Sequence, residues 1–119
     1  MDEADRQYIR LSVRLLTWVK SLDSGKVQRS LTQDVGGGGL SLITDETIAP
    51  GTRLALEIQL PDRVEPIRCM AEVIRSELQQ DSGTPTRHPT AETGVKFVEI
   101  NPKDRAFIVQ FAQLNSMPL

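Results

Sequence analysis

Several residue types that define small-protein architectures are nearly absent from this chain of 119 residues. It has one cysteine, Cys69, and one histidine, His88, which excludes an internal disulfide, a zinc finger and a histidine-rich metal site. The lone cysteine favours a reducing compartment. No apolar run approaches the roughly 18 residues of a membrane-spanning helix, and the acidic N-terminus lacks the apolar stretch of a secretory signal. We therefore expect a cytoplasmic protein without membrane insertion.

Neither sign of charge dominates, because 14 Lys and Arg face 16 Asp and Glu, for a net charge of −2. A protein that binds duplex nucleic acid usually has a strongly basic face, so we expect no nucleic-acid polymer as a partner. A single-strand binder would also need exposed stacking aromatics. Phe97, Phe107 and Phe111 are expected in the core, and Trp18 is expected to pack there as well, which leaves few aromatics for stacking.

Most of the chain alternates between apolar and polar residues, the pattern of half-buried β-strands. Strands are expected over residues 11–20, 26–31, 40–43, 53–60, 67–78 and 94–100, separated by Gly, Pro and Asp. The first two should form a hairpin around the turn at residues 23–25. In the last strand, Glu99 is expected on the same face as Val95 and Phe97. The polar segment 76–93 is interpreted largely as a long loop.

The C-terminal residues change to a helical period. Asn101 is a good N-cap and Pro102 suits the first helical position. The apolar residues that follow fall on one face of a helix: Phe107, Ile108, Phe111, Ala112 and Leu114. The sequence thus predicts an all-β dominated domain, a small barrel or sandwich, with one amphipathic C-terminal helix.

Two features carry candidate binding chemistry. Arg6 and Arg10 lie four residues apart before the first strand, and Asp34 precedes four consecutive glycines, among them Gly36 and Gly39. Guanidinium groups bind phosphate bidentately and pair with the O6/N7 edge of guanine. A carboxylate accepts hydrogen bonds from guanine donors, and glycines let backbone N–H groups approach an anion. Taken alone, these residues also fit solvated charges and an ordinary turn.

The spacing of these residues resembles that of the PilZ domain family. That family has an Arg-x-x-x-Arg motif, matched by Arg6 and Arg10, and an Asp/Asn-x-Ser-x-x-Gly motif, whose outer positions are matched by Asp34 and Gly39. The similarity continues through Gly51, through residues 71–75 and through residues 94–97, so it covers nearly the whole chain.

The resemblance implies a six-stranded antiparallel β-barrel with a C-terminal α-helix, formed by residues 11–119 and preceded by a flexible arm, residues 1–10. It also implies a bacterial receptor for the second messenger cyclic di-GMP, with no other cofactor. Arg6 and Arg10 would hold phosphates and guanine, Asp34 would accept from a guanine edge, and Gly39 would permit the tight turn and the close approach of the ligand. Ligand binding would then signal to an unidentified protein partner in motility, adhesion or exopolysaccharide control.

One position departs from the family pattern, since the motif serine is replaced by Gly36. Losing one neutral hydrogen bond costs about 0.5–1.5 kcal/mol, which predicts weakened rather than abolished binding. The alternative is a degenerate protein-interaction module that does not bind cyclic di-GMP. A homodimer stays open, and Arg14 is kept as a further cation. No nucleophile–base or metal-ligand motif occurs, so we do not expect an enzyme.

Overall fold

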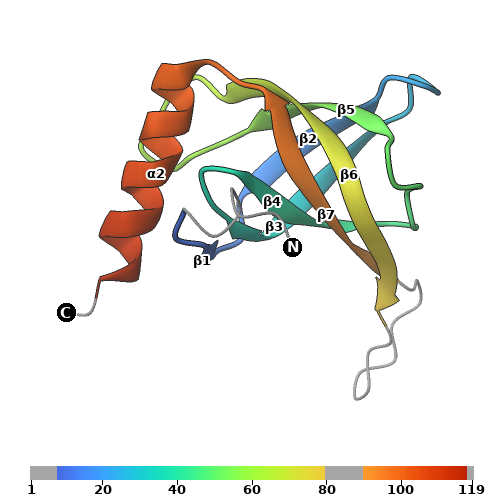
Figure 1. Cartoon of the computed structure of the whole chain (residues 1–119), viewed down its shortest axis with the longest axis horizontal. Coiled ribbons are helices and arrows are strands. Elements are labelled where there is room, and N and C mark those ends of the chain that lie inside the picture. Colours follow the sequence, from blue (N-terminus) through green and yellow to red (C-terminus); the bar gives the residue numbers. More distant parts are fainter. Residues whose placement is uncertain (1–7, 80–89, 118–119) are drawn as a thin grey trace.

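The chain folds as a closed antiparallel barrel with one helix against its side (Figure 1). The computed structural model describes residues 8–79 and 90–117. Its strands are β1 (Leu11–Ser12), β2 (Leu16–Ser21), β3 (Val27–Val35), β4 (Gly39–Thr44), β5 (Arg53–Ile58), β6 (Ile67–Gln79) and β7 (Thr90–Glu99), followed by the helix α2 (Pro102–Ser116). Strands β2 to β7 form the six-stranded barrel, and β1 is an extra short strand on β3. The expected fold class is confirmed.

The barrel closes because β3 pairs with β4 while the other neighbours run β3–β2–β5–β6–β7–β4. The expected hairpin is present, with Leu16 opposite Leu31 and Lys20 opposite Val27. The single strand expected over residues 11–20 is instead two strands, β1 and β2, which occupy one edge of β3 in turn. The division into an arm and a barrel stays a prediction, because residues 1–7 lie outside the described residues.

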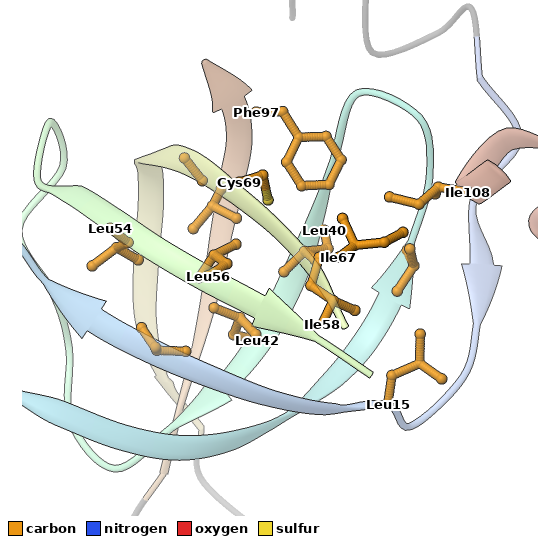
Figure 2. Close-up of a cluster of buried hydrophobic side chains, with 14 of the residues drawn as sticks. Leu15, Leu40, Leu42, Leu54, Leu56, Ile58, Ile67, Cys69, Phe97 and Ile108 are labelled. Carbon is orange, nitrogen blue, oxygen red and sulfur yellow. The ribbon is translucent and has the colours of Figure 1, made fainter. Parts of the chain in front are cut away.

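The core is formed by alternate residues of each strand. Figure 2 shows Leu40, Leu42, Leu54, Leu56 and Ile58 gathered inside the barrel, with Ile108 reaching them from the helix. Cys69, Ala71 and Val73 alternate along β6 and are buried as well. The side chain of Asn101 accepts a hydrogen bond from the N–H of Lys103 and caps the helix, as its position predicted.

Four expectations about single segments are wrong. Trp18 lies on the outer face, 44% exposed, because Thr17 and Val19 point inward. Glu99 is exposed, since a register shift between β6 and β7 ends the alternation. Leu114 is exposed near the end of the helix, beyond the barrel contact. Strands β6 and β7 also extend into the segment expected to be a loop, so only residues 80–89, which include His88, lie outside the described part.

Candidate functional site

The candidate site is built on the turn between β3 and β4. Gly36 to Gly38 connect the strands, and the N–H of Gly36 donates to the carbonyl of Gly39 at 2.9 Å. A Cβ at Gly39 would lie 2.1 Å from the carbonyl oxygen of Val95 on β7. Gly39 is therefore required by the close approach of two backbones, and its φ is not positive.

Arg10 and Asp34 are brought together at this turn. Nε and Nη2 of Arg10 donate to Oδ1 of Asp34 at 3.0 and 2.5 Å. The two side chains are 36% and 27% exposed, so the pair faces solvent at the surface of the barrel. The sequence motif placed both residues in one site, and the structure joins them directly. Arg6 lies outside the described residues.

A β-bulge turns Asp34 outward. The pairing of β3 with β4 shifts between Thr32 and Asp34, so Gln33 is the extra residue. Thr32 points into the barrel, and strict alternation would send Asp34 inward as well. Because the bulge reverses the alternation, Asp34 faces outward while Val35 is buried.

Asp34 begins a row of paired residues across the outer face of the barrel. It pairs with Ser41 on β4, which pairs with Gly94 on β7, which pairs with Arg75 on β6. A second bulge, between Val73 and Arg75, turns Arg75 outward in the same way. With strands about 4.8 Å apart, the row spans roughly 14 Å between the backbones of Asp34 and Arg75.

The middle of this row consists of small residues, and its two ends carry charged side chains. Gly94 has no side chain, and Ser41 is small and buried. A Cβ at Gly94 would touch the Arg75 side chain at 3.4 Å, so this arginine lies beside the glycine. The hydroxyl of Ser41 has no hydrogen-bond partner among the residues that the structure describes. The middle of the row is therefore covered, by Arg75 at Gly94, while the pair of Arg10 and Asp34 faces solvent at the other end.

The N-terminal residues and the helix pack against the same turn. A Cβ at Gly36 would lie 2.9 Å from both Cδ of Arg10 and the carbonyl oxygen of Ile9. At Gly37 it would lie 2.6 Å from the ring of Tyr8. The absence of side chains at Gly36 and Gly37 thus makes room for residues 8–10 against the turn. The space that a side chain at position 36 would need is already filled by Arg10 and Ile9.

Sequence reasoning missed three residues that shape the site. Arg105 of α2 donates from Nη1 to the carbonyl of Gly37 at 2.9 Å and ties the helix to the turn. Tyr8 covers the same glycine, and Arg75 reaches the row only through its bulge. No local pattern marked Arg105, and Arg75 was matched only as part of residues 71–75, with no role in binding.

Other candidate groups take structural roles. Arg14 donates to the backbone carbonyls of Thr32 and Gln33 at 3.5 and 3.2 Å, so it fastens β3. Burial raises the pKa of the Cys69 thiol to about 12, and the charge of Asp104 acts in the same direction. Within residues 8–79 and 90–117, no group of three acidic, His or Cys side chains could hold a metal ion. No helix in this part is long and apolar enough to cross a membrane.

Comparisons with known proteins agree on one family. The model of the PilZ domain matches residues 4–114. The inhibitor of motility from Bacillus subtilis (MotI/DgrA) has a TM-score of 0.74 at 23% identity, over 95% of this chain and 53% of its own. The PilZ domain of YcgR from Escherichia coli, solved with c-di-GMP, has a TM-score of 0.71 at 17% identity, over 93% of each chain.

The PilZ domain of CeSA from a cellulose-synthesizing bacterium has a TM-score of 0.60 at 13% identity, over 91% of this chain and 98% of its own. At these identities the structures share a fold. The chain spans about half the length of the Bacillus subtilis protein. The search of curated proteins returned no match.

Proposed function

This chain belongs to the PilZ domain family, and on that basis we propose that it is a cyclic di-GMP receptor that acts without catalysis. The observation that carries the proposal is the joining of Arg10 and Asp34 at the surface, at one end of a row of paired residues. Together they offer a cation and a carboxylate that suit an anionic ligand with guanine edges. The solved PilZ domain of YcgR holds this ligand.

Each group suits one part of the ligand. The guanidinium of Arg10 matches a phosphodiester oxygen or the O6/N7 edge of guanine. The carboxylate of Asp34 accepts from the N–H donors on the Watson–Crick edge of guanine. Arg75, whose side chain lies against Gly94, offers a second cation that can stack on a base once it moves off the glycine. Arg6 would supply a third, from the arm.

Binding requires the Arg10–Asp34 pair to rearrange, because the two groups already satisfy one another. The ligand offers each a replacement, a phosphate for the arginine and a guanine edge for the carboxylate. Since residues 8–10 lie against the glycine turn, any shift of Arg10 also moves the segment beside Tyr8. That movement changes the surface presented to a protein partner, which we propose as the signal that controls motility, adhesion or exopolysaccharide.

Isothermal titration of the full chain with cyclic di-GMP tests the proposal, with GTP and cyclic AMP as ligand controls. We expect saturable binding in the micromolar range and no binding of the control nucleotides. Arg10→Ala should weaken it at least tenfold. Arg53→Ala is the matched control, since Arg53 is also an exposed arginine paired with a carboxylate, at 3.2 Å from Glu72.

The proposal would be contradicted if a high concentration of cyclic di-GMP gave no heat of binding and no rise in the melting temperature of the protein. The chain would then act as a protein-interaction module without the ligand. Equal affinity in wild type and Arg10→Ala would instead show that the ligand binds elsewhere. The stoichiometry of the titration distinguishes one ligand per chain from a stacked pair.

A further inference from the structure

A second surface lies on the outer face of β2 and β3, apart from the candidate site. Its exposed apolar side chains are Leu16, Trp18, Val27 and Leu31, which are 40%, 44%, 55% and 44% exposed. Monomeric proteins seldom expose a contiguous apolar patch of more than a few hundred Å² without a use for it. We call this surface the Trp18 face.

The strand register arranges the Trp18 face in rows. Leu16 lies opposite Leu31, and Leu31 lies opposite Ile43. Trp18 lies opposite Arg29 on β3 and opposite Glu57 on β5. Paired residues point to the same side of a sheet. Trp18 is therefore the centre of a row with a cation on one side and a carboxylate on the other.

The Trp18 face is hollowed on both sides of this row. One hollow of about 310 Å³ is lined by Trp18, Lys20, Val27, Ala55 and Glu57, among others. Another of about 420 Å³ is lined by Leu16, Arg29, Leu31 and Ile43, among others. Side chains of an approaching molecule therefore have depressions to enter.

A partner centred on Trp18 cannot attach to β2 by adding a strand. Residues 17–20 of β2 pair with β3 along one edge and with β5 along the other, so their backbone N–H and C=O groups are engaged. On β3, the pairing with β4 begins at Leu31, and residues 27–30 pair with β2 alone. Recognition centred on Trp18 must therefore come from side chains, and it must suit an apolar centre flanked by both signs of charge.

We propose that the Trp18 face binds a second copy of this chain about a two-fold axis that runs along β2. Such an axis lays β3 of one copy over β5 of the other. Arg29 then faces Glu57 of the second copy, and Glu57 faces the second Arg29. Trp18 packs beside its own counterpart, and Val27 lies over Ala55. One surface thus supplies both halves of a matched interface.

The charges on the Trp18 face favour a second copy over a partner of one sign. Arg29 lies over Trp18, with its Cζ 6.0 Å from the ring centroid, and forms no ion pair within the described part of the chain. Oε1 of Glu57 accepts a hydrogen bond from Nε of Arg68 at 2.8 Å, and the other carboxylate oxygen can accept further bonds. Each copy therefore offers a cation without a carboxylate partner and an accessible carboxylate, at equal distances from the axis.

One contact opposes association. The same axis brings Lys20 near Lys20 of the second copy, because Lys20 lies on β2 beside the axis. We therefore expect a weak dimer, with a dissociation constant in the micromolar range.

Sedimentation equilibrium of the full chain without nucleotide, from about 1 to 500 μM, tests the proposal independently of the proposed function. We expect a monomer–dimer equilibrium, with the emission of Trp18, the sole tryptophan, moving to shorter wavelength on association. Arg29→Glu and Glu57→Arg should each weaken the dimer at least tenfold. Combining them should restore part of the affinity, since the facing charges are again opposite.

Lys20→Gln should tighten the dimer several-fold, a gain that misfolding cannot produce. Lys103→Glu is the control, because Lys103 is exposed on α2, away from this face. Thermal melts verify that each variant folds. A monomer at every concentration would overturn the proposal. So would a dimer whose dissociation constant is unchanged by the substitutions at Arg29, Glu57 and Lys20.

Discussion

The side chain of Arg10 reaches Asp34 across 24 residues of sequence and donates two hydrogen bonds to one carboxylate oxygen. This contact links the short segment before β1 to the bulged end of β3. Both side chains remain about one-third exposed, so water screens the pair. The pair therefore positions the segment without contributing much to the stability of the barrel.

Removing Arg10 should separate binding from folding. We expect Arg10→Ala to lower the free energy of unfolding by less than about 1 kcal/mol, because exposed ion pairs contribute little. Urea denaturation measures this change. A loss comparable to that of a core truncation would show that the segment is part of the folding unit.

The glycines of the turn should differ in their tolerance of a methyl group. Gly39→Ala drives a Cβ into the backbone of β7, which cannot yield, and should destabilise the chain by about 3 kcal/mol or prevent folding. Gly36→Ala meets Arg10 and Ile9 of the N-terminal segment, which can shift, and should cost about 1 kcal/mol.

Thermal denaturation of the two glycine variants measures the difference. The serine of the family motif should behave like alanine at position 36 and displace the carbonyl of Ile9. Equal losses in the two variants would contradict the assignment of β7 as the rigid neighbour and of residues 9–10 as the yielding one.

Arg105 should hold the turn in place from the helix. In Arg105→Gln the hydrogen bond to the carbonyl of Gly37 is lost or lengthened, and the amides of Gly37 and Gly38 should exchange with solvent faster. Global stability should fall by about 1 kcal/mol. Hydrogen exchange followed by NMR tests this, with Lys103→Gln as a helix control that should leave the turn amides unchanged.

The buried thiol predicts a loss of stability at high pH. The pKa of Cys69 is raised to about 12 in the folded chain, whereas an exposed thiol titrates near 8.5. Above the unfolded value, the unfolded chain has lost a proton that the folded chain retains. This group should therefore lower the free energy of unfolding by up to about 1.4 kcal/mol per pH unit as the pH rises from about 9 towards 12.

Cys69→Ala isolates this contribution, because every other titratable group is common to both proteins. The difference in stability between wild type and variant should shift with pH in the stated direction. Thiol reagents should modify Cys69 slowly in the folded chain and rapidly in denaturant. Equal rates in both conditions would show that the thiol is accessible.

Alternation and motif spacing predicted the barrel, most strand positions and the helix, since each depends on residues close in sequence. They failed where the backbone departs from regular pairing. The bulges at Gln33 and Ile74 reverse the direction of Asp34 and Arg75, and no local pattern marks either. The motif led to Asp34 regardless, whereas Arg75 was matched only within residues 71–75 and was assigned no role in binding.

Trp18 shows a different limit of sequence reasoning. A tryptophan in a strand is usually treated as a core residue because of its size, although its alternation with Thr17 and Val19 already placed it outside. Small hydroxyl residues such as Thr17 take the inward positions, and the large aromatic side chain of Trp18 lies on the surface. Residue size was a poorer guide here than position in the strand.

The row from Asp34 to Arg75 has a consequence for how the chain responds to a ligand. Its four residues lie on β3, β4, β7 and β6, and they are aligned only after all of these strands have paired. A partly assembled barrel presents none of this surface. A molecule bound along the row therefore acts as a clamp over three strand seams, and its occupancy should slow the opening of the barrel at the β4–β7 seam most of all.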